Sequence, residues 1–100
     1  MRIISFRKLR EFYEVHPDSR PSLEAWYAAV ENADWKTFAD VRKTARSADV
    51  YRNCTVFNIG GNKYRLIAWI NYKTHVVYVR QVLTHSDYDK DKWKDDCGSG

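Results

Sequence analysis

Three strand-like runs separated by two short turns occupy residues 55–83, and they constrain the fold more than any other feature. The runs read TVFNI, KYRLIAWI and VVYVRQVL, and they are rich in the β-branched and aromatic residues that strands favour. Gly60, Gly61 and Asn62 fill the first turn with residues that tolerate a positive φ. The pattern predicts a three-stranded antiparallel meander.

The residues before this meander carry apolar positions at helical spacing. The clearest case is the segment 21–33, in which Leu23, Trp26, Tyr27 and Val30 recur at i, i+3, i+4 and i+7. This spacing places all four side chains on one side of a helix. The segment is therefore predicted to be an amphipathic helix.

Two further helices are expected on either side of that segment. One runs from Ser5 to about His16 and is stopped by Pro17. The other is a short helix within 35–47, where Thr37 stands three residues before an aspartate in a capping-box-like arrangement. Helices followed by a sheet indicate an α+β domain in which the helices cover one sheet face.

Length and composition are those of one globular domain. One hundred residues can bury one hydrophobic core, and 44% of them are apolar. We expect a single domain over 1–96 and a flexible tail over 97–100, and the polar stretch after Asp89 is expected to be solvated. The opening MRIISFRKLREF is interrupted by Arg7, Lys8 and Arg10, so we expect no signal peptide, no membrane span and a cytoplasmic location.

Charge is unevenly distributed along the chain. The formal net charge is +4, divided into +6 over residues 1–80 and −2 over residues 81–100. A basic body attracts polyanions, and an aromatic content of 15% suits base stacking as well as core packing.

The cysteines and histidines do not form a recognisable metal or disulfide motif. Cys54 lies in a strand-like run and Cys97 in a polar tail, and we expect both to be reduced. With only three histidines in the chain, ligands at zinc-module spacing are missing. No metal and no cofactor are predicted.

Alternation along the strands predicts which side chains share a face of the sheet. In the middle run the expected core set is Tyr64, Leu66, Ala68 and Ile70, and the opposite set is Lys63, Arg65, Ile67 and Trp69. In the last run Val77, Val79 and Leu83 are expected on one side, and Val76, Tyr78, Arg80 and Val82 on the other. Arg65 and Arg80 are thus expected on one open face.

An open face with these residues has the groups needed to handle a phosphodiester. Arg65 and Arg80 can grip phosphate oxygens in bidentate fashion, and Lys63 adds a third cation. His85 can act as an acid or a base near neutral pH, and Tyr88 can stack on a base or transfer a proton. Without a metal, RNA cleavage uses the 2′-hydroxyl of the substrate, which DNA lacks.

Plainer interpretations fit the same residues. Arginines on an exposed strand face are commonly solvated and shield the sheet from association. The stretch THSDYDK can be an ordinary turn or helix start capped by Ser86 or Asp87. Spacing alone does not choose between these interpretations and a catalytic one.

Three blocks of the chain resemble the HigB family of bacterial toxins, within the larger RelE/ParE-like group. They are ADWKTFADV (33–41), VFNIGGNKYRLIAWINY (56–72) and VYVRQVLTHSDYD (77–89). The resemblance implies two long helices on a small antiparallel sheet, without metal. It implies a toxin that cleaves messenger RNA, commonly on the translating ribosome, and that a HigA-type helix-turn-helix antitoxin neutralises.

The resemblance also implies roles for individual residues. Arg65 and Arg80 match the family's phosphate-handling arginines, and Lys63 is a further RNA-binding candidate. His85 and Tyr88 match a His-x-x-Tyr after the last strand, where acid, base or stacking roles are expected. Two other functions remain open: a gyrase poison of the ParE kind, and a non-catalytic RNA-binding module.

Overall fold

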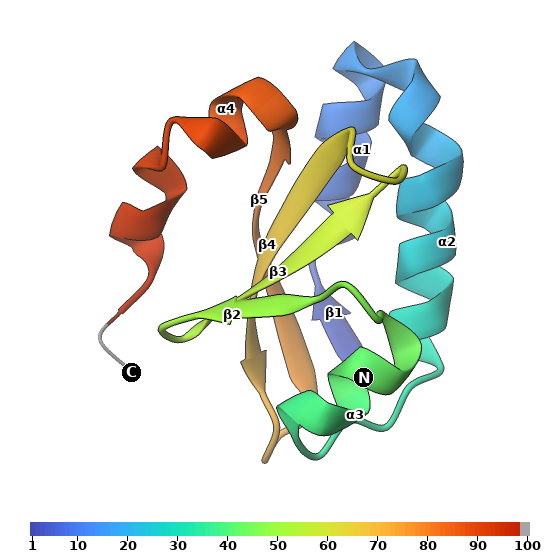
Figure 1. Cartoon of the computed structure of the whole chain (residues 1–100). Coiled ribbons are helices and arrows are strands. Elements are labelled where there is room, and N and C mark those ends of the chain that lie inside the picture. Colours follow the sequence, from blue (N-terminus) through green and yellow to red (C-terminus); the bar gives the residue numbers. More distant parts are fainter. Residues whose placement is uncertain (99–100) are drawn as a thin grey trace.

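A computed structural model describes residues 1–98, which form helices packed around one sheet (Figure 1). Along the chain the elements are β1 (Arg2–Ile4), α1 (Phe6–Val15), the 3-10 turn η1 (Pro17–Ser19), α2 (Arg20–Glu31), α3 (Phe38–Thr44), β2 (Asp49–Tyr51), β3 (Cys54–Ile59), β4 (Tyr64–Asn71), β5 (Val76–Thr84), α4 (His85–Asp89) and the 3-10 helix η2 (Lys92–Asp96). Among these residues, no helix is both long and apolar enough to cross a membrane.

The sheet has the strand order β1-β5-β4-β3-β2. The predicted meander is confirmed, because β3, β4 and β5 pair antiparallel in sequence. The short strand β2 extends it antiparallel, and β1 adds to the other side parallel to β5. The sheet is therefore mixed rather than purely antiparallel, and the α+β prediction is confirmed.

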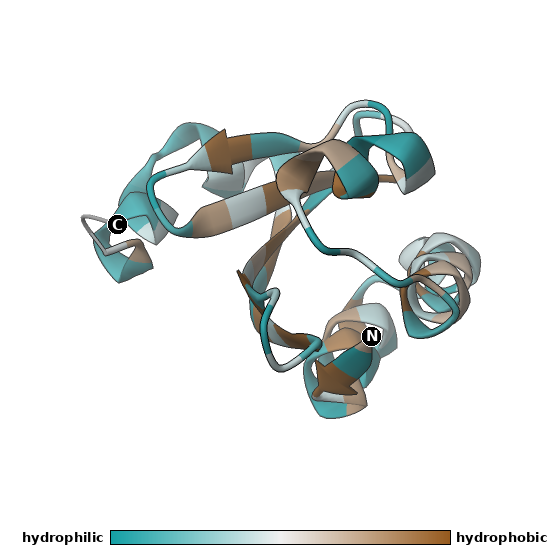
Figure 2. Ribbon diagram, turned by 90° about the horizontal axis from the view of Figure 1, so that it is seen from below, coloured by the Kyte–Doolittle hydropathy of each residue, from teal (hydrophilic) through white to brown (hydrophobic). Residues whose placement is uncertain are grey.

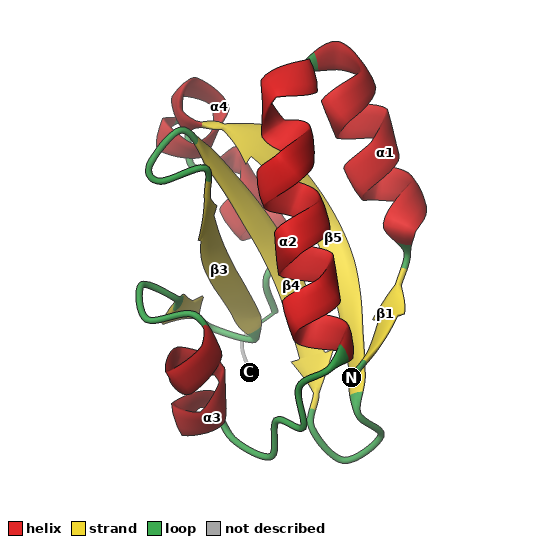
Figure 3. Ribbon diagram, turned by 90° about the vertical axis from the view of Figure 1, so that its right-hand side faces the viewer, coloured by secondary structure: helices red, strands yellow, loops and turns green. Residues whose placement is uncertain are grey.

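The helices α1 and α2 lie side by side on one face of the sheet (Figure 3). Their apolar sides meet the sheet in the main core, which includes Leu9 of α1 and Trp26 of α2. The predicted core set of β4 is confirmed, since all four of its side chains belong to this cluster: Tyr64, Leu66, Ala68 and Ile70. Burying one face of the strands against apolar helix stripes is what fixes their register.

A β-bulge in β5 changes the predicted alternation. The pairing shifts between Ile67 and Ala68, which face Gln81 and Val79, so Arg80 has no partner of its own. Beyond the bulge Val82 packs against the main core and Leu83 against the opposite cluster, the reverse of the prediction. An extra residue in one strand reverses the face of every side chain that follows it.

The opposite face of the sheet is covered along β3 and at the middle of β4, rather than open throughout. Cys54, Val56 and Ile67 pack there against Trp93 and Cys97 of the C-terminal segment, and we call these five residues the outer cluster. Trp93 is 3% exposed and Cys97 6%. The expectation of a solvated tail after Asp89 is wrong at both residues. Most of this segment is hydrophilic (teal in Figure 2). Its composition therefore gives no sign that Trp93 and Cys97 are buried.

Cys54 and Cys97 form a disulfide across this cluster, with their Cα atoms 5.5 Å apart. The prediction that both are reduced is therefore wrong. Residues separated by 43 positions meet because η2 folds back over β3. Gly98 continues the attachment, since its N–H donates to Oδ1 of Asn53 at 2.8 Å. The rest of the expected tail, residues 99 and 100, lies outside the described residues.

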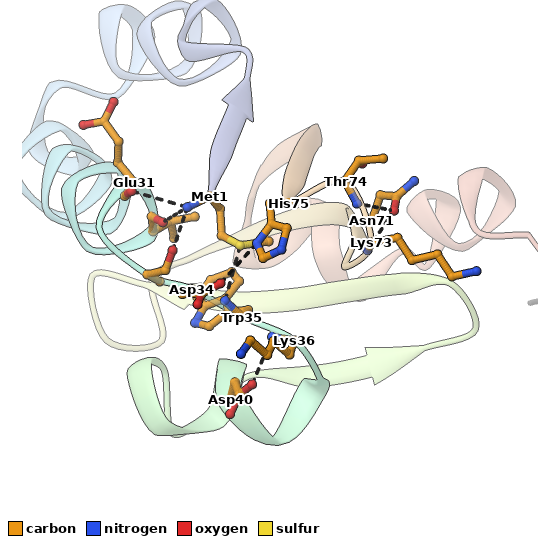
Figure 4. Close-up of polar contacts among 12 residues, drawn as sticks. Met1, Glu31, Asp34, Trp35, Lys36, Asp40, Asn71, Lys73, Thr74 and His75 are labelled. Carbon is orange, nitrogen blue, oxygen red and sulfur yellow. Dashed lines mark hydrogen bonds and ion pairs between the residues drawn. The ribbon is translucent and has the colours of Figure 1, made fainter.

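The far end of the sheet holds the N-terminus and the β4–β5 turn (Figure 4). The amino group of Met1 donates to the carbonyl oxygen of Ala33 at 2.7 Å. At the tip of the hairpin, Nδ1 of His75 lies 3.2 Å from Oδ1 of Asp34. These contacts fasten β1 and the β4–β5 turn to the loop after α2.

Candidate functional site

Pairing between β4 and β5 brings the predicted site residues together at one end of the sheet. Tyr64 faces Thr84 and Arg65 faces Leu83, so the start of β4 meets the end of β5. The N–H of His85 then donates to the carbonyl oxygen of Lys63 at 3.2 Å. Residues 18 to 22 positions apart in sequence are neighbours here because an antiparallel hairpin folds them onto each other.

Tyr88 is held against Arg65 and Trp93. The Arg65 Cζ lies 5.0 Å from the centroid of the Tyr88 ring. The rings of Tyr88 and Trp93 stack with centroids 5.1 Å apart and planes 9° apart. Trp93 Nε1 also donates to the carbonyl oxygen of Tyr88 at 3.0 Å. Trp93, which the sequence analysis did not select, therefore fixes the position of α4.

Arg65 is more enclosed than an open sheet face implies. The residue is 9% exposed. Its Nη1 donates to the carbonyl oxygens of Asn62 at 2.9 Å and Tyr64 at 3.1 Å. Both bonds use the same nitrogen, and within residues 1–98 the remaining guanidinium N–H groups make no hydrogen bond. A fixed guanidinium has less rotamer entropy to lose when it binds a phosphate.

His85 is oriented by an aspartate one helical turn further on. Its Nδ1 lies 2.9 Å from Oδ2 of Asp89, and its side chain is 52% exposed. A carboxylate that accepts the Nδ1 proton leaves Nε2 as the acceptor of the neutral ring. The sequence analysis missed Asp89. The signal was its i,i+4 spacing from His85 at the start of a helix.

The turn that carries His85 is capped by Thr84. Its Oγ1 accepts a hydrogen bond from the N–H of Asp87 at 3.1 Å, so Thr84 is the N-cap of α4. The plainer interpretation of this stretch expected Ser86 or Asp87 to be the cap, and neither residue is. The cap places His85 at the first helical position, with its side chain at the rim of the sheet.

Lys63 is paired rather than free. Its Nζ contacts Oδ2 of Asp18, and Tyr64 donates its hydroxyl to Oδ1 of the same carboxylate at 2.7 Å. The hydrogen bond from Lys63, followed by that from Tyr64, lowers the pKa of Asp18. The Asp18 carboxylate in turn raises the pKa of Lys63, which keeps the ammonium charged. Any phosphate that binds Lys63 competes with Asp18.

Arg80 lies on the same face as Arg65 but not beside it. Arg65 faces Leu83, and Arg80 is three residues back along β5, about 10 Å at the rise of a strand. Lys8 fixes the bulge by donating to the Arg80 carbonyl oxygen at 2.8 Å. The Arg80 side chain lines a hollow of about 310 Å³ with Trp69 and Asp96. The structure thus brings together Lys63, Arg65, His85 and Tyr88 and separates Arg80 from them.

A hollow lies beside this site. It is a groove of about 460 Å³ between α1 and the end of β5, lined among others by Phe12, Val15 and Leu83. Asp87 of α4 borders it, whereas Arg65 and Tyr88 do not. The candidate site itself is a shallow edge rather than a pocket.

Comparison with known proteins identifies the family of the chain. A family model described as HigB_toxin, RelE-like toxic component of a toxin-antitoxin system, matches residues 19–91. The chain belongs to the HigB toxin family. It is 31% identical over 93 residues to an mRNA interferase HigB of Escherichia coli O6:H1, covering 90% of each protein. It is 27% identical over 92 residues to the mRNA interferase toxin HigB of Escherichia coli K12, covering 89% of this chain and 88% of that protein.

The region matched by the HigB family model contains every predicted site residue. It extends through Asp89 and ends at residue 91, just before η2. Trp93, which stacks on Tyr88 of α4, and Cys97, which forms the disulfide, lie beyond it. The chain is thus a HigB toxin, the RelE-like toxic component of a toxin–antitoxin system, with a disulfide-anchored C-terminal segment.

Proposed function

We propose that this HigB toxin is an mRNA interferase, a metal-independent endoribonuclease that cuts messenger RNA on the translating ribosome. The relatives named mRNA interferase support the substrate and the reaction class. The observation that carries the proposal is the pair of His85 and Asp89, whose ring nitrogen and carboxylate oxygen are 2.9 Å apart. His85 belongs to the same short helix as Tyr88, whose ring contacts the Arg65 guanidinium, so an acid–base group and a phosphate-binding cation lie at one end of the sheet.

In the proposed reaction the 2′-hydroxyl of the RNA gives its proton to Nε2 of His85. The 2′-oxygen attacks the adjacent phosphorus, and the bond from phosphorus to the 5′-oxygen of the next nucleotide breaks. That oxygen takes up a proton, so the products are a 2′,3′-cyclic phosphate and a 5′-hydroxyl end. Asp89 stabilises the imidazolium formed in the first step.

Arg65 is the residue proposed to hold the scissile phosphate. Its charge persists at any working pH, and it offsets the negative charge that develops on the phosphate oxygens. Tyr88 is proposed either to protonate the leaving oxygen or to stack on a base, and Phe and Ala substitutions separate these roles. Lys63 can contribute once a phosphate displaces Asp18 from its ammonium.

A shallow site implies that something larger positions the RNA, since positioning supplies much of a reaction's rate. We propose that the ribosome does so and that the toxin acts in the cytoplasm, where translation occurs. A HigA-type helix-turn-helix antitoxin is the proposed neutralising partner. Acidic side chains on that partner would complement the +6 charge of residues 1–80.

The experiment is primer extension on a defined message in a cell-free translation system, with and without ribosomes. Wild-type protein should cut the message in the presence of ribosomes and cut naked RNA poorly. His85→Asn should abolish the cuts, because asparagine cannot accept the proton. Efficient cutting of free RNA would contradict the ribosome requirement. If the protein arrested the growth of cells that express it while the message stayed intact, the nuclease proposal would be contradicted and gyrase would be favoured as the target.

A matched control exists at the other end of β5. His75, like His85, is exposed and lies within 3.2 Å of an aspartate oxygen, but it sits at the opposite end of the sheet. His75 has a φ of 59°, which asparagine tolerates. His75→Asn should therefore leave cutting unchanged. Equal loss of cutting in both variants would mean that histidine removal acts through folding.

A further inference from the structure

An aromatic pair lies exposed on the outer face of the sheet, away from the site described above. Trp69 of β4 and Tyr78 of β5 face each other across the two strands. Their rings stack with centroids 5.0 Å apart and planes 22° apart. Trp69 is 37% exposed, whereas the other three tryptophans are at most 8% exposed. An indole left in water this way has an unused stacking surface.

The surroundings of this pair are hollowed and carry cations. On one side Trp69 lines the hollow of about 310 Å³ with Arg80 and Asp96. On the other it lines a second hollow of about 260 Å³ with Arg52 and Val50. The Asp96 carboxylate is engaged by the side-chain amide of Gln81. Arginines therefore flank the indole in both directions, which suits a polyanion.

The position of the pair along the sheet relates it to the catalytic end. Trp69 is four residues from Arg65 on the same face of β4, about 13 Å at the rise of a strand. Arg80 lies between them on β5, three residues from the partner of Arg65 and two from Tyr78. Arg65, Arg80 and the aromatic pair thus share one face, on which Trp93 and Cys97 cover Ile67 between Arg65 and Trp69.

A cross-strand aromatic pair commonly does no more than stabilise its sheet. That interpretation explains the contact between the two rings. It does not explain why the pair lies between two hollows with an arginine on each side. Proteins that bind single-stranded nucleic acid combine these same parts, aromatic faces for the bases and cations for the backbone.

We propose that Trp69 and Tyr78 form a stacking platform for a base of single-stranded RNA, with Arg80 holding a phosphate between this base and the cleaved bond. This inference deepens the proposed function and rests on RNA being the substrate. Arg80 lies too far along β5 to share the scissile phosphate with Arg65, and the proposal gives it a different phosphate to bind. Arg80 then positions substrate rather than stabilising the reacting phosphate.

The first test uses the fluorescence of the full-length protein, because Trp69 is its exposed tryptophan. The probe is a short single-stranded 2′-O-methyl RNA oligonucleotide, whose blocked 2′-oxygens prevent cleavage. Binding should quench the emission and protect it from acrylamide. Trp69→Leu should remove this signal and weaken binding, measured by anisotropy of a labelled oligonucleotide, roughly tenfold. Trp69→Phe should retain most of the affinity, because phenylalanine still stacks.

The control is Val15→Ala, which removes an apolar side chain that is 73% exposed on α1 and should leave binding unchanged. Thermal unfolding of each variant shows whether a loss of binding reflects a loss of folding. Equal affinity of wild type and Trp69→Leu would overturn the platform. Absence of any wild-type quenching up to the solubility limit of the oligonucleotide would overturn it too.

A second measurement separates this inference from the proposed function. In the translation system, Trp69→Leu should need a roughly tenfold higher concentration for half-maximal cutting but still cut fully at saturation. His85→Asn should not cut at any concentration. If Trp69→Leu cuts like wild type, the platform is wrong and the nuclease stands. If wild type binds the oligonucleotide but never cuts message, the nuclease is wrong and the platform stands.

Discussion

The guanidinium carbon of Arg65 lies 5.0 Å from the centre of the Tyr88 ring, which joins β4 to α4 at the end of the neighbouring strand β5. Trp93 stacks on the same ring, so Tyr88 is fixed by contacts from before and after it in the chain. This arrangement places the Tyr88 ring against a residue proposed to hold the scissile phosphate. The consequences can be measured at Tyr88, Asp89, Asp18 and the disulfide.

Two substitutions at Tyr88 separate its hydroxyl from its ring. Tyr88→Phe keeps the contacts with Arg65 and Trp93 but removes the proton. If Tyr88 is the general acid, cutting in the translation system should fall about 10²–10⁴-fold in this variant. If it only stacks, Tyr88→Phe should cut nearly normally and Tyr88→Ala should not. Full activity of Tyr88→Ala would exclude both roles.

Asp89→Asn tests the orientation of His85. An amide can offer its N–H to Nδ1 and so favour the wrong tautomer. Cutting should fall at least roughly tenfold, but the urea midpoint should hardly change because the pair is solvent-exposed. The matched control is Asp34→Asn, which removes the partner of His75 at the far end of the sheet. Normal cutting by Asp89→Asn would remove Asp89 from the site.

Reduction of the Cys54–Cys97 disulfide should destabilise the protein. A bond that closes a loop of 43 residues contributes about 4 kcal/mol through the entropy of the unfolded chain. That is a large fraction of the 5–15 kcal/mol typical of a domain. Urea unfolding with and without dithiothreitol should show the midpoint falling in the wild type. The double variant Cys54→Ala/Cys97→Ala should not respond to dithiothreitol, and a response there would exclude the disulfide as the cause.

The Asp18 cluster should make stability depend on acid pH. Its hydrogen bonds, that from Lys63 first, hold the pKa of Asp18 below the ordinary value of 3.8 for an aspartate. Since the folded pKa is below the unfolded one, this stabilisation is present above about pH 4 and is lost as the pH falls through the folded pKa. In the wild type the urea unfolding midpoint should fall as the pH is lowered below about 4, and in Asp18→Asn this fall should be smaller. An equal fall in the two proteins would contradict the assignment.

Two partner substitutions rank the causes of that shift. The hydrogen bond from Lys63 is the largest contribution and that from Tyr64 the next. Lys63→Gln should therefore raise the pKa of Asp18, followed by NMR titration of its carboxyl carbon, more than Tyr64→Phe does. The reverse order would show that the phenol, rather than the ammonium, dominates the cluster.

Local patterns predicted the long elements well. The helices over 5–16 and 21–33 appear as α1 and α2, and the three strand-like runs as β3, β4 and β5. Each has enough residues for its apolar period to identify the face that meets the core. The strands β1 and β2 have three residues each, too few to show a period, and they exist because neighbouring strands offer them hydrogen-bonding edges.

The amino-acid sequence by itself determined the α+β fold, the core face of β4 and the family, because these depend on periodicity and on residues close together in the chain. Only the tertiary structure decided that part of the outer face is covered and that Cys54 meets Cys97. It also decided that a bulge at Arg80 turns Val82 inward and that the strand register places Leu83, rather than Arg80, opposite Arg65. Those outcomes depend on how distant segments fill space against each other, and no local pattern in the chain records that.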